Sequence, residues 1–185
     1  MKISSLILLV CLPVSSFAIE AKEAQDGKRY WKGIFKGDAP FSTPHIHNVT
    51  ILSEVTYDYG KGFLETKYIR VDGNFKPVVD RVTLRRKPDG KWEQEYTDPG
   101  TGKRKLGPAE LVFDAAGKLK SLKMGRTYAS GYKYVSTSVF DATKSTNSSV
   151  LTDAKGQKFL TTTGNQYPVT KQAYDKEVSA LKLPK

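Results

Sequence analysis

Four short turn segments recur between strand-like runs, and they constrain the fold of this chain more than any other feature. Each contains an aspartate followed within three positions by a glycine. Aspartate accepts local backbone hydrogen bonds, and glycine adopts the positive φ that a tight reversal needs. The sequence therefore predicts tight hairpins at residues 87–91, 98–103, 114–118 and 153–156.

The runs between these turns alternate apolar and polar residues, as β-strands do. In one run Val49, Ile51 and Val55 share one parity, whereas Thr50 and Glu54 take the other. Nine or ten such runs follow one another. Consecutive hairpins build an antiparallel meander, and closing the meander removes its two bare edges. We therefore expect an all-β domain, an up-and-down barrel or strongly curved sheet of 8–10 strands.

The C-terminal segment has a different pattern. There is no glycine between Pro168 and Leu181, and apolar residues such as Val169, Ala173 and Val178 recur at helical spacing. Proline suits the first turn of a helix because the amide hydrogen that it lacks would be unpaired there. The pattern predicts one short helix over about 169–181, which packs against the barrel or covers one of its mouths.

The first eighteen residues have the layout of a cleavable secretory signal. Lys2 precedes an apolar run over residues 6–12, and small residues occupy the last and third-last positions of the segment. The run is shorter than the ~20 residues that a membrane-spanning helix needs, and Pro13 interrupts it. A lipoprotein anchored through Cys11 is an alternative. We expect cleavage after Ala18 and an exported protein, periplasmic or extracellular, without a transmembrane segment.

Cleavage would leave a polar tail at residues 19–28 and a single domain at residues 29–185. It would also remove Lys2 and the only cysteine, Cys11, so that 29 basic minus 19 acidic residues give a formal charge of +10. A chain without cysteine forms no disulfide and excludes thiol catalysis, iron–sulfur ligation and zinc-finger chemistry. Such an exported domain must be stabilised by its core and its hydrogen bonds.

No constellation of residues predicts a catalytic or metal site. His45 and His47 are the only histidines, and a metal site needs a third ligand, for which only carboxylates remain. Ser130 lacks the glycine two positions earlier that a nucleophile elbow requires. Glu93 and Glu95 share one strand face, which we expect to be solvated. We therefore predict no catalytic residue, metal or cofactor, and keep a barrel enzyme of unknown reaction as an alternative.

Basic residues gather in three stretches, and the excess of positive charge favours attraction to polyanions. Export argues against nucleic acid as the partner, so anionic lipid headgroups or envelope polysaccharides form the alternative partner class. A charge that only keeps the domain soluble is the simpler interpretation. The candidate anionic-surface residues are Arg85, Arg86, Lys103, Arg104 and Lys105, and the third stretch contains Lys118, Lys120, Lys123 and Arg126.

Aromatic residues are spread over nearly every predicted strand. In a small barrel such residues fill the interior or line a pocket for one apolar ligand. Tyrosine hydroxyls in the pocket would orient the ligand. We therefore predict that Trp31, Phe35, Trp92 and Tyr96 form pocket walls, with core packing as the alternative role.

With these features the chain resembles the calycin-like barrels, which include lipocalin-type proteins and related uncharacterised bacterial families. The resemblance rests on the opening segment 31–37 (WKGIFKG), the strand–turn–strand segment 55–71, the Asp–Gly hairpins and the helix after Pro168. It implies a barrel that binds a small hydrophobic or amphipathic molecule in its interior and catalyses no reaction.

Overall fold

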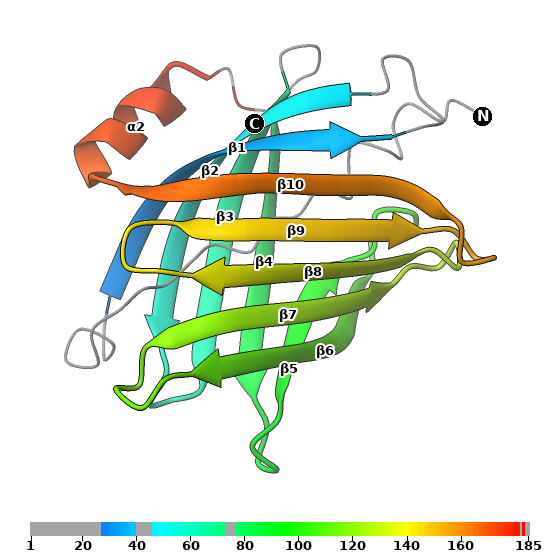
Figure 1. Ribbon diagram of the computed structural model, residues 1–185, viewed down its shortest axis with the longest axis horizontal. Coiled ribbons are helices and arrows are strands. Elements are labelled where there is room, and N and C mark those ends of the chain that lie inside the picture. Colours follow the sequence, from blue (N-terminus) through cyan, green and yellow to red (C-terminus); the bar gives the residue numbers. More distant parts are fainter. Residues whose placement is uncertain (1–26, 40–45, 73–76, 182, 184–185) are drawn as a thin grey trace.

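A computed structural model describes residues 27–39, 46–72, 77–181 and 183, and these residues form ten strands and one helix (Figure 1). The helix α2 spans Lys171–Ser179. The strands are β1 (Gly27–Asp38), β2 (Ile46–Asp58), β3 (Phe63–Asp72), β4 (Val78–Arg86), β5 (Trp92–Thr97), β6 (Arg104–Phe113), β7 (Leu119–Thr127), β8 (Lys133–Phe140), β9 (Ser145–Thr152) and β10 (Lys158–Val169).

The ten strands close into one antiparallel barrel. Each strand pairs with the next in sequence, and β1 also pairs with β10 from Tyr30↔Val169 to Asp38↔Thr161. In Figure 1 the strands β7–β10 cross β3 and β4 at a steep angle. The predicted all-β fold is confirmed, and of the two geometries that the hairpin pattern allowed, the closed barrel is the one formed.

All four predicted hairpin turns are present. In three of them the aspartate amide donates across the turn, to Lys103 O from Asp98, to Lys118 O from Asp114 and to Gln157 O from Asp153. Glycines 90, 102, 117 and 156 have the expected positive φ. Three further turns lie at residues 59–62, 128–132 and 141–144. The first follows Asp58, which accepts the Lys61 amide, and has positive φ at Gly62, so it shares the chemistry of the four predicted turns. The second lacks the aspartate and the third lacks the glycine.

The helix packs on the outer wall of the barrel and does not cover a mouth. Leu52 and Ile69 point outward from β2 and β3, yet they are buried because Tyr174 of α2 lies over them. The Oγ1 atom of Thr170 caps the helix by accepting a hydrogen bond from the Ala173 amide at 3.2 Å. Pro168, predicted in the first helical turn, belongs to β10 instead. Among the described residues, no helix is long and apolar enough to cross a membrane.

Strands β4 and β5 are hydrogen-bonded to each other over only part of their length. The pairing of β4 with β5 covers residues 83–86 and 92–95, whereas β3 pairs with β4 over its whole shared length. The first half of β4 and the end of β5 therefore diverge. We call this feature the β4–β5 split, and it consists of residues 78–82 on β4 and 96–97 on β5.

Candidate ligand site in the barrel interior

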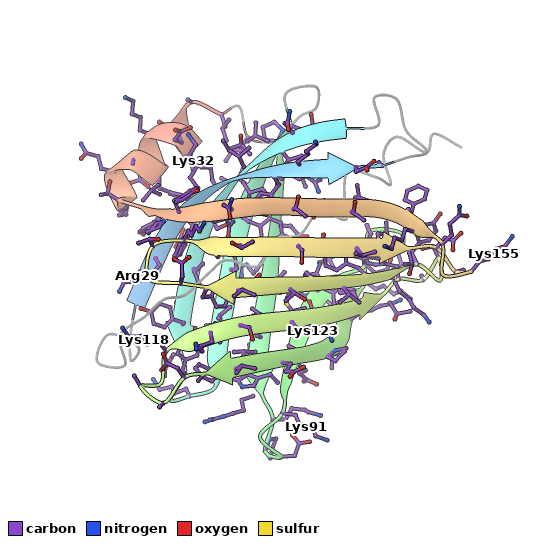
Figure 2. The ribbon with its side chains drawn as sticks, viewed as in Figure 1. Arg29, Lys32, Lys91, Lys118, Lys123 and Lys155 are labelled. Atoms are coloured by element: carbon purple, nitrogen blue, oxygen red, sulfur yellow. The ribbon has the colours of Figure 1, made fainter. Side chains whose placement is uncertain are left out.

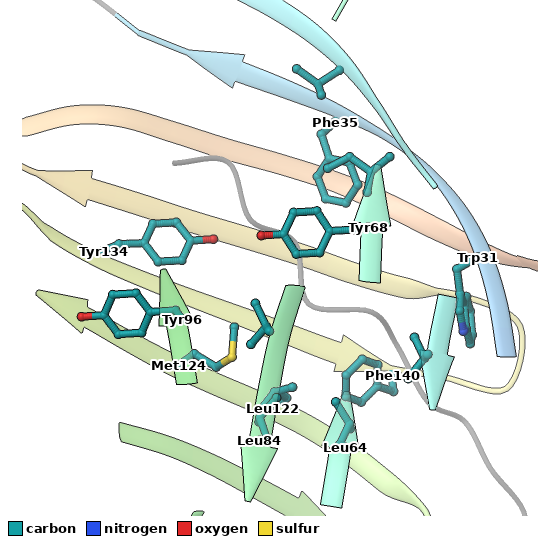
Figure 3. Close-up of a cluster of buried hydrophobic side chains, with 14 of the residues drawn as sticks. Trp31, Phe35, Leu64, Tyr68, Leu84, Tyr96, Leu122, Met124, Tyr134 and Phe140 are labelled. Atoms are coloured by element: carbon teal, nitrogen blue, oxygen red, sulfur yellow. The ribbon is translucent and has the colours of Figure 1, made fainter. Parts of the chain in front are cut away.

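The interior of the barrel has two chemically different walls. Strands β1 to β7 supply most of the aromatic and aliphatic side chains, part of which Figure 3 shows. Strands β8 to β10 supply mainly small hydroxyl and amide side chains. The buried members of this polar wall are Ser136, Ser138, Ser145, Asn147, Ser149, Thr162 and Gln166.

The four predicted pocket-wall residues all lie on the inner surface and are buried. Trp31 and Phe35 come from β1, and Trp92 and Tyr96 come from β5. The structure does not bring the four into one group, because Trp92 and Tyr96 stand at opposite ends of β5. Contact of any of them with a ligand stays a prediction.

Trp92 belongs to a group of rings at one end of the barrel, which we call the aromatic plug. The ring of Tyr59 lies 5.5 Å from that of Tyr57, 6.5 Å from that of Trp92 and 5.3 Å from that of Phe113, measured between centroids. The last two contacts are edge-to-face, which is a favoured aromatic geometry. These residues fill the plug end of the interior with apolar contacts.

Tyr96 lies toward the other end of β5, beside the buried guanidinium of Arg126. The Arg126 side chain, 3% exposed, lies 5.1 Å from the centroid of the Tyr96 ring and 5.5 Å from that of Tyr134. Its Nε donates a hydrogen bond to Gln94 Oε1 at 2.8 Å. We call Arg126, Gln94, Tyr96, Tyr134 and Tyr128 the Arg126 cluster.

Gln94 holds the guanidinium in place through both ends of its amide. While Oε1 accepts from Arg126, Nε2 donates to the backbone oxygen of Gly125 at 2.8 Å. The Tyr96 hydroxyl is also engaged, because it donates to Thr127 O at 2.9 Å. The ring face of Tyr96, not its hydroxyl, therefore faces the Arg126 side chain.

Several buried polar atoms of the interior have no hydrogen-bond partner among the described residues. They include Nη2 of Arg126, the hydroxyls of Tyr128, Ser136 and Thr66, and Oε1 of Gln166. In folded proteins most buried polar atoms are paired with protein, water or a ligand. These atoms are therefore candidates for pairing with water or with the polar groups of a bound molecule.

The buried phenols of this region stay protonated near neutral pH. Burial raises the pKa of Tyr128 well above its usual value, although the Arg126 charge opposes the rise. Burial, reinforced by the Asp80 carboxylate, also raises the pKa of Tyr68. The Tyr68 hydroxyl donates to Asp80 Oδ2 at 2.8 Å. These hydroxyls are therefore neutral hydrogen-bond donors.

Asp98 ties two turns together at the end opposite the aromatic plug, which we call the Asp98 end. Its side chain is buried, and Oδ2 accepts from the Ala129 amide and from Lys105 Nζ, both at 2.7 Å. Oδ1 accepts from the Gly100 amide at 2.9 Å. The tether joins the β5–β6 turn to the β7–β8 turn and so fixes Tyr128, which directly precedes Ala129 in the sequence.

We expect this tether to weaken in acid. Burial alone would raise the pKa of Asp98, but the hydrogen bonds from Lys105, Ala129 and Gly100 outweigh it and lower the pKa below 3.8. Because the folded value is lowered, the carboxylate stabilises the fold above the unfolded pKa and loses this effect as pH falls through the folded value.

Asp98→Asn should therefore reduce the free energy of unfolding by about 2 kcal/mol at neutral pH. The difference from the wild type should shrink toward pH 3, as measured by urea unfolding at both pH values. Asp89→Asn, in an exposed turn, is the control. A deficit of Asp98→Asn that stays the same at both pH values would contradict the tether's charge dependence.

The candidate anionic-surface residues fall into two groups. Arg85 and Arg86 lie at the plug end of β4. Arg104 and Lys105 lie at the Asp98 end of β6, and Lys103 precedes them in the β5–β6 turn. Arg104 pairs with a carboxylate of its neighbour strand, and Lys105 pairs with Asp98. Figure 2 shows other basic side chains scattered over the molecule. Binding of an anionic envelope component stays a prediction.

The histidine pair lies largely outside the described part of the chain. His45 is not among the described residues, and His47 belongs to β2, where its side chain is not described. The described residues contain no group of three His, Cys, Asp or Glu side chains that could hold a metal ion.

A scan against protein-family models and a search of curated proteins found no match for this chain. Among solved structures, the fold is similar to that of an S-type phycobiliprotein lyase, CPES, from Guillardia theta. The TM-score is 0.53 at 8% sequence identity, and the match covers 82% of this chain and 91% of the lyase. The similarity is one of fold alone, that of an antiparallel β-barrel. Membership of the calycin-like barrels stays a prediction.

Proposed function

We propose that this protein is a non-enzymatic barrel that binds one small amphipathic molecule in its interior. The observation that carries the proposal is the group of buried polar atoms without a described protein partner, among them Arg126 Nη2 and the Ser136 hydroxyl. A buried polar atom left unpaired costs about 1–3 kcal/mol. A ligand with a polar end and an apolar body would pair these atoms and lie against the ring-rich wall.

The dimensions of the barrel support this proposal. Barrel diameter grows with strand number, and about eight strands give an interior that side chains can just fill. This barrel has ten strands, and much of its β8–β10 wall consists of serine and threonine. A wider barrel with small side chains on one wall favours the binding of a ligand in the interior.

The β4–β5 split supports access from the side. A pocket of about 420 Å³ lies there, and its lining includes Val79 and Asp80 of β4 and Thr97 of β5. Asp80 also reaches the interior, because the buried Tyr68 hydroxyl donates to it. A ligand that passed this pocket would arrive next to Tyr96 and the Arg126 cluster.

A fluorescent fatty-acid probe tests the proposal. Titration of the purified protein with 11-(dansylamino)undecanoic acid should give saturable binding of one probe per chain, and native mass spectrometry should show the same stoichiometry. Absence of saturable binding would overturn the proposal.

Two matched variants on β8 locate the site. Ser136→Phe places a ring in the interior and should abolish probe binding, whereas Val139→Phe, at a position 55% exposed on the outer face, should keep it. Equal probe binding by the two variants would place the site outside the barrel interior.

We also propose that the chain is exported and that residues 1–18 are removed. N-terminal sequencing of protein from a periplasmic or extracellular fraction should begin at Ile19. Recovery of the intact chain from the cytosol would contradict export. The similar solved barrel belongs to a phycobiliprotein lyase, so a barrel enzyme of unknown reaction is the second candidate.

A further inference from the structure

We infer that the ligand carries a carboxylate, and that Arg126 receives this group inside the barrel; the inference rests on the proposed function and names the ligand class. Arg126 is a permanently charged group held within the interior. Removing a guanidinium from water without a counter-charge is strongly unfavourable. No direct ion pair formed by the described residues involves Arg126. The Asp80 carboxylate, which like Arg126 acts on Tyr68 and Tyr128, accepts a hydrogen bond from the Tyr68 hydroxyl instead.

The protein compensates this charge only in part. The rings of Tyr96 and Tyr134 lie within cation–π distance, and Gln94 accepts one hydrogen bond from Nε. Both are interactions with neutral groups. The Nη2 edge remains without a partner among the described residues. An anion bound at this edge would supply a charge-assisted hydrogen bond, which is roughly twice as strong as a neutral one.

Two neutral donors near Arg126 fit the remaining needs of a carboxylate. Tyr128 packs against Tyr96 with ring centroids 6.0 Å apart, and its hydroxyl has no partner in the described part of the chain. Ser136 lies two positions from Tyr134 on the inner face of β8, and its hydroxyl is likewise without a described partner. A carboxylate accepts several hydrogen bonds through two oxygens, so one cation with neutral hydroxyl donors suits a singly charged head group.

The neighbours of Arg126 on β7 give the ligand its direction. Alternate residues of a strand face one side, so Leu122, Met124 and Arg126 all point into the barrel. This row runs from the cation toward the aromatic plug, and Figure 3 shows Met124 and Leu122 among the buried apolar side chains. A head group at Arg126 would therefore place an apolar tail along Met124 and Leu122.

Three probes that share one twelve-carbon tail separate the possible head groups. Dodecanoic acid, dodecanol and dodecyl phosphate displace the dansylated probe to different extents if the head group matters. We expect the wild-type protein to bind the acid at least about tenfold more tightly than the alcohol, and more tightly than the phosphate. Tighter binding of the phosphate would overturn the carboxylate assignment.

Arg126→Met should lower the affinity for the acid about 30- to 100-fold and leave that for the alcohol nearly unchanged. Retained alcohol binding shows that the variant is folded. Arg85→Met, at an exposed position where the guanidinium lies over the Phe63 ring, is the matched control and should keep the preference for the acid. An unchanged acid preference in Arg126→Met would overturn the inference.

Binding of the three probes to the wild-type protein separates failure of the head-group assignment from failure of the proposed function. If the wild-type protein binds the acid, the alcohol and the phosphate equally, the barrel is a binding protein and only the assignment of the head group is wrong. If it binds none of the three, the proposed function itself is wrong and the head-group assignment falls with it.

Discussion

Gln94→Glu is expected to lower the affinity for dodecanoic acid by about two orders of magnitude. The amide oxygen of Gln94 already lies 2.8 Å from Arg126 Nε, so a carboxylate of the same shape would give the guanidinium an internal counter-ion. A ligand carboxylate would then meet a site with no net charge and a nearby negative group. At an effective dielectric of ~20, two like charges 4–6 Å apart repel by about 3–4 kcal/mol, which is enough for the expected loss.

The affinity of this variant for dodecanol separates charge from folding. Glutamate cannot donate as Gln94 Nε2 does to Gly125 O, so we expect a loss of about 1–2 kcal/mol in the free energy of unfolding. The alcohol should still bind as it does to the wild type. Gln157→Glu makes the same charge change in an exposed turn and should bind the acid normally. Undiminished acid binding by Gln94→Glu would contradict the role of Arg126.

Much of the fold follows from local chemistry that the sequence displays openly. The turns at residues 114–118 and 153–157 depend on an aspartate that accepts amides of its own turn and on a glycine with positive φ. These are interactions between near neighbours in the chain. Closure of the barrel depends on the pairing of β1 with β10, which are far apart in sequence, so local patterns predicted a closed barrel only as one of two possible geometries.

The position of the helix is indicated by apolar residues that lie on both faces of β2 and β3, and not only on the inner face. Val49, Ile51 and Val55 mark the inner face of β2, but Leu52 has the opposite parity and is also apolar. In β3, Ile69 likewise stands out of phase beside the inward Tyr68. Apolar residues on both faces of two adjacent strands indicate that the outer face is covered as well, as α2 covers it.

In the sequence, Arg126 ends the third basic stretch, but in the structure its side chain does not lie on the surface with the other residues of that stretch. Lys120 and Lys123 are exposed, whereas Arg126 is buried. The distinguishing signal is strand parity, because Arg126 stands two and four positions after the apolar residues Met124 and Leu122. Net charge and clustering along the chain do not take this alternation into account, so they did not identify Arg126 as a buried residue.

A large effect on stability is expected at Gly107, which faces the interior opposite Gln94 on the neighbouring strand. A Cβ atom at this position would lie 2.3 Å from the backbone oxygen of Gly125 and 3.5 Å from Gln94 Nε2. The close atom belongs to the backbone, so no side-chain rotation relieves the clash and a strand must shift. Gly107→Ala should lower the free energy of unfolding by about 3 kcal/mol or more, as measured by urea denaturation.

Gly60→Ala is the matched control, because its added Cβ would meet only the Asp58 carboxylate at 3.4 Å, and neither glycine has a left-handed backbone. We expect that variant to change stability by less than about 1 kcal/mol. Since the Gly125 oxygen also accepts from Gln94, which holds Arg126, Gly107→Ala should weaken acid binding along with stability. A Gly107→Ala protein as stable as Gly60→Ala would show that β6 and β7 do not approach this closely, and would remove the support for Gln94 at that point.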